Sequence, residues 1–500
     1  MNIAHIRPGF TLVKYVCDDT PCWRAYLMKV DLDTPGLRFD FGYPNGDEIG
    51  ATAKTSAHAA ALKTKLEAEF GTGKVLFQTG INCEFFGGDG YTQRLNIRDG
   101  RQVQTGYDPN VPGFGAGNLR IYETTDGKFH MSEALFSGSV SVGGADYAIG
   151  YVNTLHHNAS GVAVFTDGYL GTMPAAGVEI EFDEPFAGGG GITLAGKPFK
   201  VIGPISSGAK FSGRSAKRGA LVGLSSGEQS AIAALTANAT GTLSWGLTGV
   251  EGTADVRNLA GVWLWVLRDG EYVPNDDQHE DFATYTKGYP RTCMGLSAKN
   301  NQAVFCVNDG RQADWSLHMS TAQVAALLLA EGCENAGQFD GGGSTTLWDS
   351  INGVENRPCG GATPGVEAGE VADLGEERTV AQTMFFSVID QGGGEEEEEY
   401  AELPDGVICA APDGTGDGSA WDKAASIADA VAAAGANGTV WLKEGIYTLS
   451  AGLATANAVS ILGGFKGTEA SAADRDPAAR SVLDGDQAVD IILSITASSG

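Results

Sequence analysis

The sequence predicts an α+β fold: a large domain built on mixed β-sheet with a few helices, followed by a smaller all-β domain. Three observations predict it. Glycine makes up 72 of the 500 residues, which favours tight turns and β-rich architecture over helical bundles. Short strand patterns outnumber helical patterns through residues 1–389. An acidic, glycine-rich run at residues 390–403, DQGGGEEEEEYAEL, indicates a solvated linker between the two domains.

The sequence of the first part of the chain predicts several strands, then one helix, then a further strand that is buried. Residues 1–50 hold the strand patterns TLVKYV, WRAYLMKVDL and LRFDFGYP. Residues 55–70 predict a helix, with Thr55 or Ser56 as its N-cap and Gly71 just past its end. The segment KVLFQTGINCEFF that follows predicts a buried strand that runs into a loop.

The middle of the chain predicts further short strands and a hairpin. Residues 90–220 alternate strand patterns with glycine-rich turns, and residues 227–238 predict a second helix. Residues 291–308 predict two strands around a turn at 298–301.

A third helix and a closing strand complete the large domain. Residues 320–332 predict the helix, since Ser320 can cap it, Gln323 completes a capping box and Gly332 ends it. Residues 379–389 predict the closing strand. We therefore place the large domain at residues 1–389.

Residues 404–500 have a different sequence pattern. A helix pattern lies near 422–434, and the segments VSILGGFKG and SVLDGD recur as strand–turn units. Residues 405–490 thus resemble the opening of a right-handed parallel β-helix of the pectate-lyase kind. That resemblance implies an N-terminal cap helix and a first coil at GTVWLKEGIYTL. A solenoid needs several coils to be stable, so we expect an incomplete β-helix domain here.

The composition excludes several classes of partner and cofactor. A net charge of −29 repels nucleic acid and anionic membranes. No apolar run of about 18 residues exists, so we expect no membrane span. The sequence has no GxxxxGK[ST] motif, and its cysteines and histidines, including His156, His157 and His318, lack metal-ligand spacing. We therefore expect no cofactor and no bound metal.

Polar residues gather beside the predicted strand ends, where a rigid sheet presents functional groups. They stand in five short segments along the large domain. The candidates for substrate binding or catalysis are Asn82, Glu84, Arg291, Thr292, Asp309, Arg311, Ser316, Asp340, Gly341, Gly342, Gly343, Ser344, Thr345 and Arg378.

The residue types suit a phosphate or carboxylate group. Arginines are planar bidentate donors, and glycines let backbone N–H groups approach a ligand oxygen. Asp340 and Asp309 could serve acid/base or nucleophilic roles at an anomeric carbon. Structural alternatives remain open: Asp309 could only shape a turn, Arg291 could join a structural ion pair, and Asn82 could bond turn backbone.

The order of these segments resembles the phosphodiester glycosidase family over residues 75–389. The stretch RTCMGLSAKNNQAVFCVNDGRQADWS, a helix, and then QFDGGGSTTLW carry the resemblance. It implies hydrolysis of the sugar–phosphate glycosidic bond of a sugar-1-phosphodiester, of the GlcNAc-1-phosphodiester type. The sequence departs from the family at Glu84, where a small residue is usual, and at Thr379 and Gln382. These departures bear on substrate preference more than on reaction class.

The resemblance also implies roles for single residues. Arg291 and Arg311 would hold the phosphodiester with support from Arg378, and residues 341–345 would hold phosphate or sugar oxygens. Asp340 is the first candidate for the catalytic carboxylate and Asp309 the second.

The eight cysteines leave a choice open. A symmetric hairpin register places Cys293 opposite Cys306, so the two could form a disulfide or stay as buried free thiols. Cys17 and Cys22 could close a short loop. Oxidised cysteines would favour an extracytoplasmic or secreted protein, although no signal peptide is visible in the chain.

Three functions compete at this stage. The leading one is a hydrolase that acts on a carbohydrate or phosphoglycan, such as a surface polymer. The second is a non-catalytic glycan-binding protein or adhesin, of the kind found in phage tails. The third places the chemistry in the C-terminal domain as a polysaccharide lyase.

Overall fold

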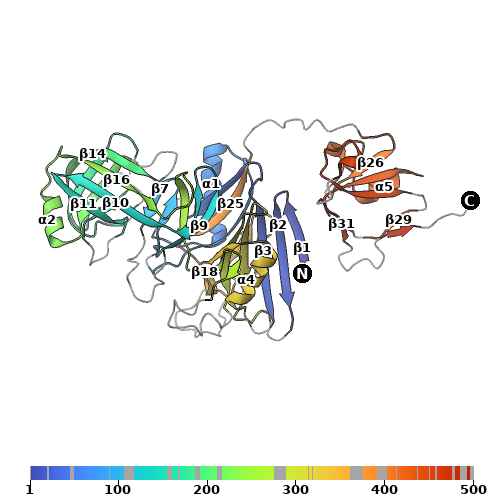
Figure 1. Cartoon of the computed structure of the whole chain (residues 1–500), viewed down its shortest axis with the longest axis horizontal. Helices are drawn as coiled ribbons and strands as arrows, with labels where there is room; N and C mark the ends of the chain where they lie inside the picture. Colours follow the sequence, from blue (N-terminus) through green and yellow to red (C-terminus); the bar gives the residue numbers. More distant parts are fainter. Residues whose placement is uncertain are drawn as a thin grey trace, which may run out of the picture. The chain divides into compact units, whose positions relative to one another are not determined.

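The computed structural model divides the chain into two compact units, Met1–Gln391 and Gly392–Gly500, and we describe each by itself (Figure 1). Most of the acidic run predicted as a linker lies outside the described residues, and so do His156, His157 and His318. The structure describes residues 2–19, 22–44, 50–88, 90–105, 118–154, 160–166, 169, 171–185, 192–210, 217–274, 289–312, 315–317, 319–360, 375–390, 403–412, 414–435, 437–449, 451–455, 459–475, 479–484 and 493–495.

The fold is mostly β, so the predicted α+β class was wrong. Strands account for 47% of the structure and helices for 13%. Seven of the strands close into a barrel. The sequence pattern showed short strands and glycine turns in this region but not their closure, because closure depends on pairing between distant strands.

One eight-stranded sheet carries the predicted hairpin at its centre. Its order is β1-β2-β3-β21-β20-β22-β18-β19. The strands are β1 (Asn2–Arg7), β2 (Phe10–Cys17), β3 (Trp23–Asp31), β18 (Leu264–Arg268), β19 (Glu271–Tyr272), β20 (Arg291–Ser297), β21 (Gln302–Asn308) and β22 (Asn335–Gln338).

A five-stranded sheet, β24-β23-β5-β25-β4, packs against the first. Its strands are β4 (Leu37–Gly42), β5 (Val75–Asn82), β23 (Leu347–Asp349), β24 (Gly353–Val354) and β25 (Thr383–Ile389). Every residue of β25 is buried. Side chains alternate between the two faces of a strand. Met384 and Phe386 accordingly join the core between the sheets, while Phe385 packs with α1 (Thr55–Phe70).

Helices cover the outer faces of both sheets, which gives four layers in the order helix, sheet, sheet, helix. Helix α1 packs on the five-stranded sheet. Helix α4 (Thr321–Ala330) packs on the eight-stranded sheet, as Figure 1 shows. The capping box of Ser320 and Gln323 on α4 is confirmed. Helix α1 begins where predicted, but its N-cap is Lys54 without a side-chain bond, because the Ser56 hydroxyl bonds Glu377 instead.

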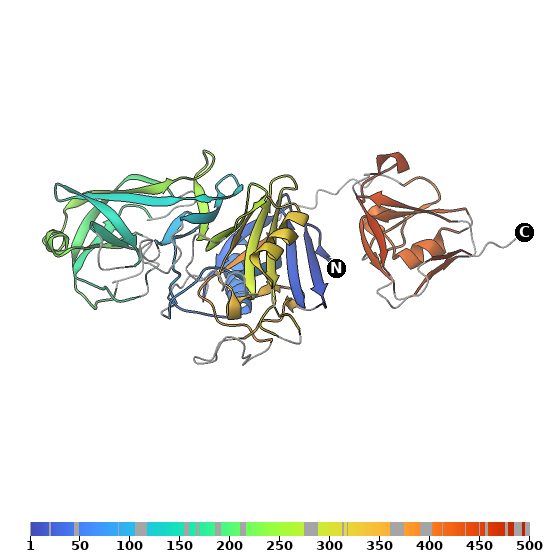
Figure 2. The same cartoon turned by 60° about the horizontal axis from the view of Figure 1, so that its bottom comes forward.

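A third sheet connects these layers to the barrel. Its order is β7-β6-β17-β8-β9, with β6 (Asn96–Arg98), β7 (Arg101–Gln104), β8 (Leu119–Thr124), β9 (Phe129–Glu133) and β17 (Val256–Gly261). The barrel, cyan to green in Figure 2, follows β9 along the chain. Its strands are β10 (Leu135–Val142), β11 (Ala145–Val152), β12 (Val162–Phe165), β13 (Gly177–Phe182), β14 (Leu194–Ile205), β15 (Arg218–Gly223) and β16 (Thr240–Thr248).

Helix α2 (Ser226–Ala233) lies beside the barrel and ends earlier than the predicted 227–238. Ser225 caps it, and Glu228 completes a capping box that the sequence analysis overlooked. Apolar side chains fill the barrel interior, among them Val164, Ile180, Leu221 and Leu243. The barrel is therefore a packed core rather than a channel.

The second unit holds short parallel strands rather than a parallel β-helix, so that prediction was wrong. The described strands form separate sheets of three, two and two strands. They are β26 (Val407–Ala410), β27 (Thr439–Lys443), β28 (Gly445–Thr448), β29 (Leu453–Thr455), β30 (Ser460–Phe465), β31 (Ser481–Asp484) and β32 (Leu493–Ile495). The strand–turn pattern did indicate short strands that pair in parallel. Small separate sheets do not make a continuous solenoid.

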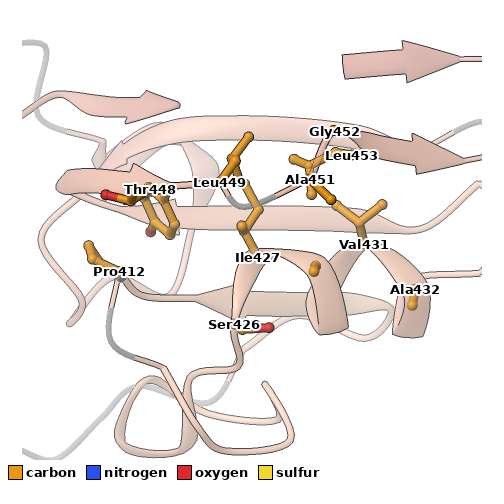
Figure 3. A pocket seen from close by; sticks show the side chains of 12 residues that line it. Pro412, Ser426, Ile427, Val431, Ala432, Thr448, Leu449, Ala451, Gly452 and Leu453 are labelled. Atoms are coloured by element: carbon orange, nitrogen blue, oxygen red, sulfur yellow. The ribbon is translucent and has the colours of Figure 1, made fainter. Parts of the chain in front are cut away.

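Helix α5 (Ile427–Ala433) packs on these strands and borders a cavity of about 490 Å³. Figure 3 shows Ile427 and Val431 of the helix facing Leu449 and Leu453 across it. The lining is largely apolar and carries no acid or base. Among the described helices of either unit, none has the length and apolar character needed to cross a bilayer.

Candidate active site

The chain passes from one sheet to the other through residues 339–346, which we call the Gly-rich loop. The loop leaves β22, where Gln338 pairs with Cys293 of β20. It then enters β23, where Leu347 pairs with Ile81 of β5. The loop therefore bridges both sheets at the point where β5 ends and β20 begins, and three predicted site segments meet there.

Asn82 ties these three segments together. Its Nδ2 donates to the Asp340 carbonyl at 2.7 Å. Its Oδ1 accepts from the Thr292 hydroxyl at 2.7 Å and from the Thr346 N–H at 3.1 Å. Asn82 and Thr292 are both fully buried. Their side chains are thus committed to holding the loop, and substrate contact by either would have to break these bonds.

The glycines of the loop are required by close packing and backbone conformation. Gly342 has φ of +63°, a left-handed conformation that side chains disfavour. A Cβ on Gly341 would lie 2.7 Å from the Pro290 carbonyl oxygen, and one on Gly343 would lie 2.4 Å from that of Gly360. The Gly341 and Gly342 N–H groups bond Asp340 Oδ1 and the Pro290 carbonyl. The predicted backbone cradle is therefore partly used within the protein.

Asp340 has a buried carboxyl with a strongly shifted pKa. Burial raises the pKa of Asp340 to about 6, opposed by the Ser344 hydroxyl, the Arg378 guanidinium and the Gly341 N–H. The Ser344 hydroxyl lies near this carboxyl but makes no hydrogen bond of normal geometry. Thr345 Oγ1 is likewise buried without a hydrogen-bond partner in the described part of the chain. Two buried hydroxyls without hydrogen-bond partners, in the same loop as a titratable carboxyl, favour a site for a polar ligand.

Arg311 and Arg378 lie against successive glycines of the loop. A Cβ on Gly342 would lie 3.2 Å from Arg311 Nη1, and one on Gly343 would lie 3.4 Å from Arg378 Cδ. The Arg311 guanidinium stacks on Tyr289 at 4.8 Å and that of Arg378 on Phe86 at 5.7 Å. These aromatic rings orient both guanidinium groups beside the loop.

Glu377 anchors the segment that carries Arg378. Its carboxylate accepts from the Ser56 N–H at 2.9 Å and from the Ser56 hydroxyl, at the first turn of α1. A carboxylate is favoured at a helix N-terminus by the helix dipole.

Arg291 is engaged with the protein itself. Its Nη1 donates to Gln338 Oε1 at 2.9 Å and its Nε to the Met319 carbonyl at 3.3 Å. Only 2% of the residue is exposed. These contacts join β20 to β22 and to the segment before α4, which favours the structural alternative for Arg291 over phosphate binding.

Asp309 is surrounded by hydrogen-bond donors. Its carboxyl accepts from Tyr26 Oη at 3.2 Å, Trp315 Nε1 at 2.7 Å, Asn356 Nδ2 at 3.1 Å and the Arg357 N–H at 3.0 Å. Burial raises the pKa of Asp309, and these four donors oppose the rise. Asp309 thus sits in a closed hydrogen-bond network rather than facing a ligand.

Ser316 belongs to the same network. Its hydroxyl donates to the Asp309 carbonyl at 2.8 Å and accepts from the Arg24 N–H at 3.0 Å. The residue is fully buried. These bonds fix the backbone around Asp309.

Glu84 points toward a different set of partners. Its carboxylate accepts from the Gly261 N–H and, at 3.1 Å, from the Arg94 N–H. Burial raises the pKa of Glu84 to about 7, opposed by Gly261, Arg120 and Arg94. The carboxylate therefore bonds the end of β17 and not the Gly-rich loop.

Asn356 is a residue that the sequence analysis missed. Its Nδ2 donates to both Asp309 Oδ1 and the Thr345 carbonyl, and its Oδ1 accepts from the Leu347 N–H. The only sequence signal was a polar Asn-Arg-Pro after a short strand, which resembles an ordinary turn.

Cys293 and Cys306 face each other in the register of β20 and β21. Both are buried free thiols in the structure, and Cys17 is a half-buried free thiol. A disulfide between Cys293 and Cys306 stays a prediction for the oxidised protein. Intact mass before and after reduction of the alkylated protein checks it: a gain on reduction indicates a bond, and an unchanged mass rules it out.

No group of three or more His, Cys, Asp or Glu side chains in the described ranges is arranged to hold a metal ion. Within those ranges, the candidate site consists of the Gly-rich loop with Asp340, together with Arg311 and Arg378.

The comparison with family models returns one match. Residues 202–383 match the model of the phosphodiester glycosidase family. The matched stretch contains the Gly-rich loop, Arg311 and Arg378, so the coarser part of the sequence resemblance is confirmed. No curated protein matches the chain.

Solved structures share the fold at low sequence identity. A hypothetical protein from Synechocystis is 14% identical with a TM-score of 0.52, over 77% of this chain and 63% of that one. The chain thus spans less than two thirds of that protein. A Burkholderia pseudomallei protein titled "Putative exported protein" is 16% identical with a TM-score of 0.50, over 73% and 74% of the two chains.

The zebrafish N-acetylglucosamine-1-phosphodiester α-N-acetylglucosaminidase catalytic domain, auto-inhibited by its pro-peptide, is also similar. It is 13% identical with a TM-score of 0.39, over 77% of this chain and 85% of that one. At these identities, the Synechocystis and Burkholderia structures establish a shared fold.

Proposed function

We propose that the chain is a hydrolase that cleaves the glycosidic C–O bond of a sugar-1-phosphodiester and releases sugar and a phosphomonoester. One observation carries the proposal: the Gly-rich loop holds a buried carboxyl, Asp340, near Arg378, together with two buried hydroxyls without hydrogen-bond partners, and Arg311 lies against its Gly342. The family match over residues 202–383 supports the reaction class.

Arg311 and Arg378 would bind the phosphodiester and stabilise the charge that grows on the leaving phosphate. The hydroxyls of Ser344 and Thr345 would donate to phosphate or sugar oxygens. Asp340, whose pKa burial raises to about 6, would in its protonated form donate its proton to the leaving oxygen as the C–O bond breaks. Water would then add to the anomeric carbon, and its proton would return to Asp340.

A GlcNAc-1-phosphodiester is the substrate we propose first, within a glycan or phosphoglycan. An extracytoplasmic or secreted location remains part of this proposal. The test is incubation with α-GlcNAc-1-phosphate methyl ester and measurement of free GlcNAc. No turnover of any sugar-1-phosphodiester, together with retained glycan binding, would favour the non-catalytic glycan-binding alternative.

Removing either arginine is expected to weaken catalysis strongly. Arg311→Ala and Arg378→Ala should each lower kcat/KM by roughly 10²-fold, because each removes a charged donor from the developing phosphate. Steady-state kinetics on the methyl ester measures this effect. Arg268→Ala is the matched control, since the Arg268 side chain is 60% exposed and ion-pairs with Asp269 instead. Wild-type kinetics in both site variants would contradict the assignment.

A further inference from the structure

We propose that Asp309 and Asn356 form a positioning pair that fixes the Gly-rich loop, and that Asp309 takes no part in proton transfer. The inference rests on the proposed function for its kinetic readout. It concerns how the loop is held, and it reassigns the second carboxylate of the site.

The contacts of Asn356 lead directly from Asp309 to the loop. Asn356 Nδ2 donates to Asp309 Oδ1 at 3.1 Å and to the Thr345 carbonyl at 3.2 Å, while Asn356 Oδ1 accepts from the Leu347 N–H at 2.8 Å. Asn356 is only 7% exposed. A carboxylate offers acceptors only, so Asp309 fixes which end of the Asn356 amide faces it. The Asn356 side chain is thereby held with its nitrogen toward Asp309 and the Thr345 carbonyl, and with its oxygen toward the Leu347 N–H.

Two buried asparagines hold the loop: Asn82 bonds both of its ends, and Asn356 bonds its C-terminal end. Asn82 holds the Asp340 carbonyl and the Thr346 N–H, and Asn356 holds the Thr345 carbonyl and the Leu347 N–H. Between these anchors lie the Ser344 and Thr345 hydroxyls, which have no hydrogen-bond partner in the described structure. Two fixed ends therefore present the unsatisfied hydroxyls in one geometry, as a pre-organised binding site requires.

The surroundings of Asp309 argue against a chemical role. Four groups donate to its carboxyl, and the residue is 1% exposed. A proton donor must meet the atom that receives the proton. Asp309 could do so only by giving up donors that arrive from distant parts of the fold.

The experiment compares Asp309→Asn, Asn356→Ala and the control Tyr26→Phe. Tyr26 also donates to Asp309, at 3.2 Å, but in the described structure its hydroxyl makes no hydrogen bond to the loop. The control therefore removes one donor from Asp309 without loosening the Asn356 bridge. Two readouts apply: kinetics on α-GlcNAc-1-phosphate methyl ester over a pH series, and hydrogen exchange in the free protein at the Leu347 amide, which directly follows the loop.

We expect kcat to fall by roughly 10- to 100-fold in Asn356→Ala and in Asp309→Asn, with the pH dependence of the wild type, because small displacements of a site cost about this much. Tyr26→Phe should keep wild-type kcat. Exchange at the Leu347 amide should quicken in Asp309→Asn, although Asp309 does not touch that amide, and should be unchanged in Tyr26→Phe.

The outcomes separate this inference from the proposed function. An Asp309→Asn enzyme that loses the pH dependence, while Asn356→Ala keeps wild-type kcat, would overturn the positioning role. If the wild type turns over no sugar-1-phosphodiester, the proposed function fails, yet exchange still tests the pair. Unchanged Leu347 exchange in Asp309→Asn would then overturn it. If Asp309→Asn does not fold, the positioning role is tested by comparing the kcat of Asn356→Ala with that of Tyr26→Phe. A lower kcat in Asn356→Ala alone supports the role, and equal kcat values contradict it.

Discussion

Asp340→Asn is expected to lower kcat on α-GlcNAc-1-phosphate methyl ester by roughly 10²- to 10⁴-fold, the usual contribution of a positioned acid or base. The change keeps the shape of the side chain and the acceptor for the Gly341 N–H. It removes the transferable proton and, above about pH 6, the charge of the ionised carboxylate. Single-turnover and steady-state assays measure the loss, and a variant with wild-type kcat would exclude Asp340 from the chemistry.

The pH dependence of the rate shows whether Asp340 acts as a proton donor or as a base. Because burial raises the pKa of Asp340 to about 6, the carboxyl is protonated below that pH and ionised above it. A proton donor must be protonated, so kcat/KM should fall as pH rises through about 6. A rate that instead rises through pH 6 would identify Asp340 as a base.

The same shift predicts that Asp340 destabilises the fold at high pH. A carboxyl whose folded pKa is raised favours folding below its unfolded pKa, and this stability is lost as pH rises toward about 6. Asp340→Asn should therefore be more stable than the wild type at pH 8, on the order of 3 kcal/mol by linkage. Urea unfolding at pH 4 and pH 8 measures this difference and shows that the inactive variant is folded.

Gly343→Ala is the second change expected to have a large effect. The added Cβ would lie 2.4 Å from the Gly360 carbonyl oxygen, which is backbone and cannot swing away. Overpacking of this kind costs about 1–3 kcal/mol. Relief by movement of the loop would shift Ser344 and Arg378, so we also expect a loss in kcat of roughly 10²-fold.

Thermal unfolding and kinetics of Gly343→Ala check both effects. Gly203→Ala in β14 is the matched control, because its added Cβ meets nothing within 4 Å. Gly203→Ala should keep the stability and activity of the wild type within a few tenths of a kcal/mol, as surface changes do. Equal behaviour of the two variants would mean that the loop is not tightly packed.

Local patterns in the sequence predicted the elements that position the site. The capping box of Ser320 and Gln323 identified α4, and the hairpin register placed Cys293 opposite Cys306. Both features depend on residues near each other in the chain, where propensity and turn chemistry act directly.

Long-range contacts decide what each site residue does, and the sequence does not display them. Asp309 meets Tyr26 across 283 residues and Asn356 across 47. From the sequence alone, Asp309-Gly310 could equally be a simple turn or part of a closed hydrogen-bond network. The partners of Arg291 and Glu84 were hidden for the same reason, since they come from separate strands. Barrel closure in residues 135–248 was equally hidden.

The most direct test of the central claim follows the oxygen of water. Hydrolysis of α-GlcNAc-1-phosphate methyl ester in H₂¹⁸O, followed by mass spectrometry of the released methyl phosphate, shows which bond breaks. Cleavage of the glycosidic C–O bond predicts unlabelled methyl phosphate, with the label in the GlcNAc hydroxyl. Methyl phosphate that carries ¹⁸O would show attack at phosphorus and would contradict a glycosidase.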